Sequence, residues 1–454
     1  MSFLLKIQNK IATKFSLLDV DFREIAKSAS STFILKNIAL IFSYIFNLIL
    51  AWLYGADVIG IYSLMLSVYS IFSLFGSFGS QTSVVRYIAE YAGKQDWNSI
   101  NKFFTKITKL ILSLSLLMSI MFYLSSEFIS IAIFNEPRLV PALKMTAFLL
   151  PVGSFFVICT SALRGIKSIL PSITLQTVLP LTNIIILLIL SFTISKSYLN
   201  PIYMHVITTI ILSVLGYITW LKYKKRFINE DTVPSKNIIS YKEIINVSTP
   251  MIVTAGMFFI MGWTDTFMLG IYSSTKEIGI YRIALKISIF ISFALGAVNA
   301  IAGPKFSELF WSGQNERLKD VVNQSAKLIF WVTLPIFIFL LVFSFPILNF
   351  FGPEFIKGQN VLIILGIGQL FNALFGSVGL LMDMSGNQAH FRNAMIIGAI
   401  VNVLLNYLLI PTYGILGAAI GTGLSTIIWN LIAAIKAYNI FGYWIGYNPQ
   451  FSKL

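Results

Sequence analysis

Three cationic residues interrupt long apolar stretches of this chain, at Lys36, Arg282 and Lys286. A charge inside a membrane-spanning stretch is costly, so each of them is a candidate functional residue. Arg282 and Lys286 are four residues apart and therefore share one face of a helix. The chemistry open to such a set is to hold an anion, and the planar fork of arginine suits phosphate oxygens. We expect all three side chains to line a wet central cavity.

A structural interpretation of the same residues stays open. Lys36 lies about two turns into its apolar run, and Arg282 lies near the far end of its own run, so both could reach lipid headgroups. Arg86 follows an apolar run on a polar ramp. It is either a contact for headgroups at the mouth of the cavity or an anchor that sets topology.

Four further polar residues stand within apolar stretches. Asp265 is either a cation or proton site that couples transport to a sodium or proton gradient, or the partner of one of the three cations in a salt bridge. Asn402 and Asn406 share one helix face, and Asn47 interrupts the first apolar run. These asparagines are candidates for hydrogen bonds between helices or for contacts with sugar hydroxyls.

The composition requires a membrane protein. Hydrophobic residues make up 57% of the chain and charged residues 11%, with a mean hydropathy of +0.82, whereas soluble domains carry roughly 25% charge. Runs of about 20 apolar residues predict an all-α integral membrane protein, since a β-barrel would show alternating segments of ~10 residues. The single cysteine, Cys159, excludes an intramolecular disulfide. No Cys/His cluster has metal-ligand spacing, and we expect structural roles for His205 and His390.

The predicted organisation is two six-helix lobes. We predict about twelve spans, roughly 30–54, 58–80, 107–125, 142–163, 169–194, 201–221, 246–270, 279–302, 326–346, 360–383, 393–410 and 414–438. The expected parts are an amphipathic segment without signal-peptide character (roughly 1–28), an N-terminal lobe (29–221), a linker (222–245), a C-terminal lobe (246–438) and a tail (439–454). With the N-terminus inside, 25 of the 33 Lys and Arg residues lie inside and five outside. This bias predicts cytoplasmic termini in the cell inner (cytoplasmic) membrane, and it accounts for most of the net charge of +15 without nucleic-acid binding.

An internal repeat supports the two lobes. The triplet Gly60-Ile61-Tyr62 recurs at 279–281, an offset of 219, and the same offset places Ser73 on Ser292 and Asn183 on Asn402. Because each half has an even number of spans, the repeats must be parallel, with an axis along the membrane normal. Transporters built in this way hold the substrate between the halves and alternate access by rocking.

The motifs of the chain resemble those of a known family. Leu53–Asp96 contains a G-x-Y turn into a span and then an R-x-I-A-E-Y-x-G-K ramp. Together with Leu408–Ser425 and the segment Ala162-Leu163-Arg164-Gly165, it resembles the polysaccharide biosynthesis flippases, the Wzx-type exporters of lipid-linked oligosaccharide. Their superfamily (MOP) includes MATE exporters and lipid II flippases.

The resemblance implies a V-shaped bundle and a specific cargo. The cargo would be a polyprenyl-pyrophosphate-linked oligosaccharide, moved from the inner to the outer leaflet for O-antigen, capsule or other surface polysaccharide. Lys36, Arg86, Arg282 and Lys286 would hold the pyrophosphate. Membrane lipids, a polysaccharide polymerase and glycosyltransferases would be partners, with no cofactor beyond Na⁺ or H⁺ coupling.

Two other functions are alternatives. A cation-coupled MATE-like exporter of small molecules would gain from carboxylates within the spans of the first half, where we find none well inside. A membrane glycosyltransferase or polymerase would need an extramembrane loop that carries catalytic groups, and the outer connections are short and lack paired carboxylates.

Overall fold

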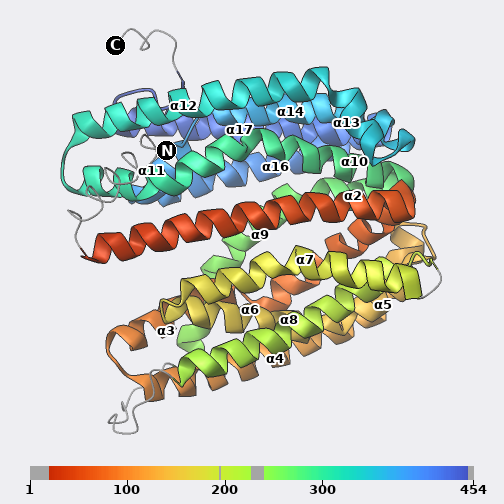
Figure 1. Ribbon diagram of the computed structural model, residues 1–454, viewed down its shortest axis with the longest axis horizontal. Coiled ribbons are helices and arrows are strands. Elements are labelled where there is room, and N and C mark those ends of the chain that lie inside the picture. The colour runs from red at the N-terminus through yellow and green to blue at the C-terminus, as the bar shows by residue number, and fades with distance from the viewer. Residues whose placement is uncertain (1–19, 194–195, 226–239, 448–454) are drawn as a thin grey trace, which may run out of the picture.

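The structure, a computed structural model, describes residues 20–193, 196–225 and 240–447 and is helical almost throughout them (Figure 1). The first half contains α2 (Val20–Ser77), α3 (Ser80–Gly93), α4 (Trp97–Glu127), η1 (Phe128–Ile133), α5 (Leu139–Ala147), α6 (Leu149–Gly165), α7 (Ile169–Thr193) and α8 (Asn200–Lys224). The second half contains α9 (Tyr241–Tyr272), α10 (Thr275–Ile289), η2 (Phe290–Ser292), α11 (Phe293–Trp311), α12 (Asn315–Val342), α13 (Ser344–Phe351), η3 (Pro353–Gly358), α14 (Gln359–Leu374), α15 (Val378–Met384), α16 (Gln388–Tyr413) and α17 (Ile415–Phe441). Much of the predicted N-terminal segment, linker and tail lies outside the described residues.

The all-α membrane class is confirmed, but the predicted number of twelve spans is not confirmed. Within the described residues, eight helices are long and apolar enough to cross a membrane, and two bent helix pairs raise the number to ten. The prediction of twelve is not reproduced at two places. The stretch Ile34–Gly93, predicted as two spans, counts as one candidate of 60 residues although the helix is broken at Gly55, and α9 is not among the candidates.

The helix α2 contains a sharp corner at Gly55. The helix reverses direction there, with φ of 73° and ψ of −178°, inside what otherwise reads as a single helix. A side chain rarely adopts this backbone conformation, and a Cβ at Gly55 would also lie 2.9 Å from the Glu354 Oε1 atom. The break expected between the predicted spans 30–54 and 58–80 is therefore present, as a corner within α2.

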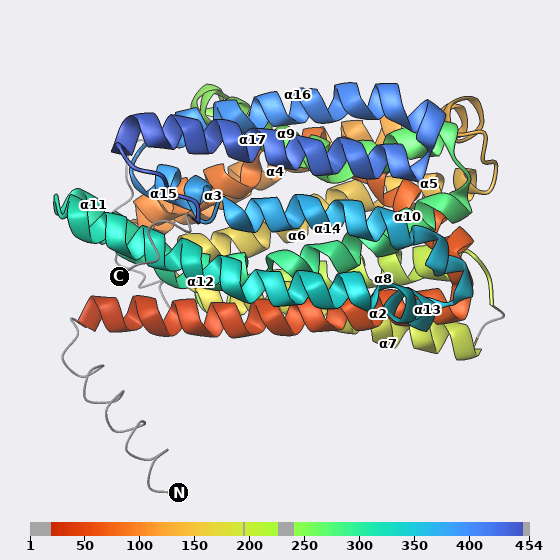
Figure 2. The same cartoon turned by 90° about the horizontal axis from the view of Figure 1, so that it is seen from above.

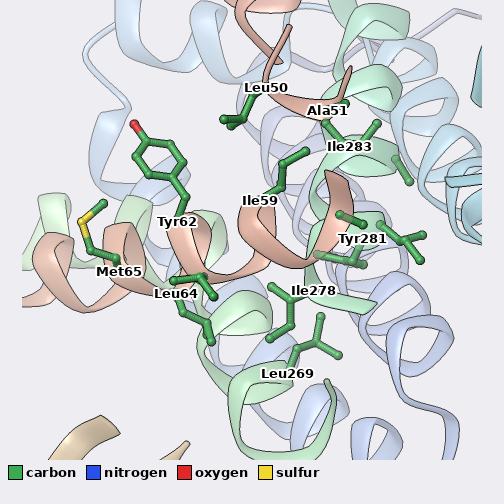
Figure 3. Packing of buried hydrophobic residues seen from close by; sticks show 14 of the residues in the cluster. Leu50, Ala51, Ile59, Tyr62, Leu64, Met65, Leu269, Ile278, Tyr281 and Ile283 are labelled. Atoms are coloured by element: carbon green, nitrogen blue, oxygen red, sulfur yellow. The ribbon is translucent and has the colours of Figure 1, made fainter. Parts of the chain in front are cut away.

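The hydrophobic core is shared at one end of the bundle and divided at the other. We call the end that carries Gly55, Arg138 and Glu354 the shared end, because one buried cluster there contains residues of both halves. Figure 3 shows this packing, where Ile59 of α2 lies near Ile278 and Ile283 of α10. The opposite end, which carries Gly93 and Trp311, is the split end.

Two separate clusters form the core of the split end. One consists of α3, α4, α6 and neighbouring residues, including Ile88, Phe103 and Trp220. The other consists of α11, α15, α17 and neighbouring residues, including Phe306 and Val378. In Figure 1, α3 to α8 form one layer and α10 to α17 the other, with α2 and α9 between them, and Figure 2 shows the same bundle from above. Two bundles joined at one end and separate at the other can enclose space between them.

Candidate functional site

A cavity of about 590 Å³ lies between α2 and the α10–α11 segment. Lys36 and Asn37 line it from α2, and Phe290, Phe293 and Asn299 line it from the opposite side. Lys36 is exposed in this structure. The lining is mostly apolar with a cation at one edge, which suits a ligand with an apolar tail and an anionic head.

Arg282 and Lys286 lie on α10 and, unlike Lys36, are not among the residues that line this cavity. The Lys286 ammonium is 5.7 Å from the centre of the Tyr44 ring, and the Tyr44 hydroxyl donates a 2.7 Å hydrogen bond to the Lys286 carbonyl oxygen. The Arg282 guanidinium lies 4.3 Å from the centre of the Trp263 ring on α9. It also donates to the Thr266 hydroxyl at 3.3 Å.

None of the three predicted cations forms an ion pair within the described ranges, where all six pairs involve other residues. Lys286 contacts Tyr44 of α2 and Arg282 contacts Trp263 of α9, and Lys36 lines the first cavity. They keep their charge available for an anion that is not part of the protein. An unpaired charge within a membrane bundle is costly, so an anionic ligand would offset that cost.

The other predicted site residues are placed apart from this group. Arg86 is exposed on α3 at the split end, 5.7 Å from the ring of Tyr87. Asn47 donates to the Ser43 carbonyl oxygen of its own helix at 2.6 Å. His205 is buried beside the rings of Tyr62 and Tyr69.

Asp265 is 2% exposed and lies in a cluster of hydroxyl and amide groups. Its carboxylate accepts hydrogen bonds from the Tyr281 hydroxyl and, at 3.3 Å, from the Thr422 hydroxyl. Asn402 donates to the Thr422 hydroxyl at 3.3 Å, and Asn406 donates to the Asn402 amide oxygen at 3.2 Å. No lysine or arginine of the described residues lies within ion-pair distance of this carboxylate. Both asparagines are buried; Asn402 joins α16 to α17 through Thr422 and Ser425, whereas the hydrogen bond of Asn406 to Asn402 lies within α16.

Sequence reasoning did not identify a second cavity, of about 370 Å³, between α2–α3 and α9. Ser70, Ser73 and Ser77 line it from α2, and Phe259 and Trp263 line it from α9. The spacing of the three serines, three and four residues apart on one helix face, is the signal that could have identified it.

The shared end is closed by a reciprocal contact between α2 and α10. A Cβ at Gly60 would lie 1.7 Å from the Thr275 carbonyl oxygen, and a Cβ at Gly279 would lie 1.9 Å from the Ala56 carbonyl oxygen. The offset of 219 relates Gly60 to Gly279 and also Ala56 to Thr275. The two helices therefore cross at equivalent positions, where only glycine allows so close an approach.

Polar groups surround this crossing, and we call them the clamp: Asp57, Glu136, Arg138, Thr275, Lys276 and Glu354. Arg138 pairs with Asp57 at 2.7 Å and with Glu136 at 2.8 Å. Asp57 accepts a hydrogen bond from Thr275 across the two halves. Glu354 accepts from the Ala56 backbone at 2.6 Å and pairs with Lys276 at 2.7 Å. Glu136 and Asp57 hold the pKa of Arg138 above its ordinary value, so Arg138 stays charged.

Comparison with known sequences is consistent with these features. The profile of a family described as "Polysaccharide biosynthesis protein" matches residues 49–356. The probable low-salt glycan biosynthesis flippase Agl15 of Haloferax volcanii is 28% identical over 187 residues, which is 40% of this chain and 39% of that protein. The chain thus spans about two fifths of the length of this relative.

Solved structures show the same fold. The lipid II flippase MurJ, in an inward closed conformation, superposes with a TM-score of 0.71 at 18% identity, covering 90% of this chain and 89% of that chain. An inward-facing multidrug resistance MATE family transporter of the MOP superfamily gives 0.66 at 16% identity, with coverage of 88% and 98%. At these identities the likeness concerns the fold.

Proposed function

The chain belongs to the polysaccharide biosynthesis protein family, a family of transporters and flippases rather than enzymes, and from this premise we propose that it is a lipid-linked oligosaccharide flippase. Its cargo would be a polyprenyl-pyrophosphate-linked oligosaccharide, moved from the cytoplasmic to the outer leaflet by alternating access. The product would supply O-antigen, capsule or another surface polysaccharide, so glycosyltransferases and a polymerase would be its functional partners.

The proposal includes a topology. Twelve spans in two parallel lobes, 29–221 and 246–438, would form a V in the cell inner membrane, with both termini and the split end cytoplasmic. The lysine-rich connections near Lys94 and Lys305 support this orientation. The reciprocal approaches of Gly60 to Thr275 and of Gly279 to Ala56 support parallel repeats, because an axis along the bundle brings equivalent segments together.

The observation that carries the proposal is the set of unpaired cations along the gap between α2 and α10–α11. The pyrophosphate would meet Lys36 in the first cavity and move toward Lys286 and Arg282. The polyprenyl tail would stay in the bilayer, in contact with the apolar side of the opening. With the clamp closed at the shared end, the head is received from the split end, and breaking the clamp would release it to the other side.

Asp265 supplies a candidate for energy coupling. Its carboxylate, the Thr422 hydroxyl and the amide oxygen of Asn402 are oxygen ligands of the kind that bind Na⁺ or take up a proton. The Asn406 amide oxygen is buried and has no hydrogen-bond partner within the described residues. Cation binding would alter the packing of α9 against α16 and α17, which we propose biases the rocking of the C-terminal lobe.

A reconstituted assay tests the function. Proteoliposomes that contain the full chain would be loaded with a fluorescent polyprenyl-pyrophosphate-linked sugar, and the fraction accessible from outside would be followed over time. We expect catalysed flipping, and we expect Lys286→Met to reduce its rate at least tenfold. Lys327→Met, which removes an exposed lysine of α12 away from the gap, is the matched control. Normal flipping by folded Lys286→Met protein would reject the pyrophosphate role.

The same preparation distinguishes the exporter alternative. A MATE-like exporter would move a small fluorescent organic cation in response to a sodium or proton gradient and would leave the sugar lipid in place. This outcome would replace the flippase proposal.

A further inference from the structure

One wall of the second cavity is a row of hydroxyl groups. Ser70, Ser73 and Ser77 follow one another along α2, and Gln81 continues the row on α3. Ser70 and Ser77 donate to carbonyl oxygens of their own helix, at 2.7 Å and 3.4 Å, so their oxygens still accept hydrogen bonds. The Ser73 hydroxyl makes no hydrogen bond within the part of the chain that the structure describes. This wall can both donate to and accept from a polar ligand.

The facing wall is a row of apolar and aromatic groups on α9. Met251, Ala255, Phe259 and Trp263 recur at every fourth residue and therefore lie on one side of the helix. Phe259 and Trp263 are half-buried, so parts of their rings are accessible from the cavity. No carboxylate or lysine lines this cavity, which makes it unsuited to a charged ligand.

The cavity adjoins the cationic group through one side chain. Trp263 lines the cavity and also contacts the Arg282 guanidinium at 4.3 Å. In a polyprenyl-pyrophosphate-linked sugar, the first sugar is bonded directly to the pyrophosphate. A sugar site must therefore lie next to the phosphate-binding arginine, and this cavity does.

We propose that the second cavity binds the first sugars of the cargo, an inference that rests on the proposed function. A pyranose ring has an apolar C–H face and polar hydroxyl edges. Its C–H face would stack on Phe259 and Trp263, and its hydroxyl groups would exchange hydrogen bonds with Ser70, Ser73 and Ser77. The site recognises a neutral hexose ring, whereas Arg282 and Lys286 recognise the pyrophosphate.

Binding to two probes tests this division. The purified full chain in detergent would be titrated with farnesyl pyrophosphate and with farnesyl pyrophosphate that carries one N-acetylglucosamine. We expect the wild type to bind the sugar-bearing probe at least tenfold more tightly. Phe259→Leu and Ser73→Val should each weaken that binding about fivefold, since one aromatic contact or one hydrogen bond contributes about 1 kcal/mol. Their affinity for farnesyl pyrophosphate should not change.

Phe259 is preferred to Trp263 for this test because Trp263 also positions Arg282. The matched controls are Trp331→Leu on α12 and Ser113→Val on α4, which change exposed residues outside both cavities. They should leave both affinities unchanged, and Lys286→Met should weaken both probes equally.

The outcomes separate the two proposals. Equal binding of the two probes by the wild type, or unchanged sugar-probe binding by folded Phe259→Leu and Ser73→Val proteins, would overturn the sugar site and leave the flippase proposal standing. Failure of the wild type to bind either probe would overturn the flippase proposal itself.

Discussion

Substitution of Gly279 by alanine should open the shared end. The new Cβ would lie 1.9 Å from the Ala56 carbonyl oxygen, whereas a normal carbon–oxygen contact is about 3.3 Å. The helices α2 and α10 must therefore separate by about 1.4 Å at their crossing. Overpacking of this kind costs about 1–3 kcal/mol, and that cost applies only when the shared end is closed. The equilibrium between closed and open forms should shift by about 5- to 150-fold toward the open form.

A buried cysteine reports the opening. Ile278 is 0% exposed in the shared core, so Ile278→Cys should react with a water-soluble maleimide only when this end opens. The native Cys159 is also buried and can be removed as Cys159→Ala. We expect the labelling rate of Ile278→Cys to rise about 5- to 150-fold when Gly279→Ala is added.

The control for this experiment is Gly93→Ala. It also replaces a helical glycine by alanine, at the last residue of α3, but no atom lies within 4 Å of the new Cβ. It should leave the labelling rate unchanged. The double variant Gly60→Ala with Gly279→Ala should cost less than the sum of the two single changes, because one separation of the helices relieves both clashes. An unchanged labelling rate in folded Gly279→Ala protein would refute the argument.

Three further predictions concern charges. Asp57→Asn should raise the labelling rate of Ile278→Cys by less than about fivefold, because its pair with Arg138 is substantially exposed and such pairs contribute about 0.2–1 kcal/mol. Lys144→Gln, which breaks a pair within the first half only, should leave that rate unchanged. Asp265→Asn should abolish any dependence of flipping on sodium or pH, and a variant that retains this dependence would exclude coupling at Asp265. Arg282→Lys should slow flipping more than Lys286→Arg does, because lysine lacks the planar guanidinium that lies over the Trp263 ring, and equal rates would contradict that role.

The class, the family and the corner of α2 were predictable because each depends on local sequence. Apolar runs identify membrane helices, and Gly55 identifies a sharp reversal. The common face of Arg282 and Lys286 follows from helical spacing alone. The number of spans was harder to predict, because the boundary between two spans is not marked by the end of a helix. The helix α2 continues through its corner, and α5 and α6 form one bent pair with an angle of 48°.

The partners of the charged residues could not be predicted, because they come from distant parts of the chain. The clamp joins Asp57, Arg138 and Glu354, which belong to three segments with no shared motif. Asp265 shows the same limit, since the sequence offers three cations as partners and the fold surrounds the carboxylate with Tyr281 and Thr422 instead. The stack of Arg282 on Trp263 depends on the packing of α9 against α10, which periodicity does not define.

The internal repeat, with its offset of 219 residues, relates the closed shared end to the proposed rocking motion. Gly60 approaches Thr275 and Gly279 approaches Ala56 at equivalent positions, so the proposed axis of the repeat would pass through the crossing of α2 and α10. Points near an axis move least when two lobes rock, and the cations and both cavities lie farther along the same helices, toward the split end. The crossing is closely packed and lies within the shared hydrophobic core. The clamp adds exposed ion pairs that water can replace, each contributing about 0.2–1 kcal/mol. Under the proposed function, this contact would keep the shared end closed while the substrate loads, and rocking of the lobes would have to separate it.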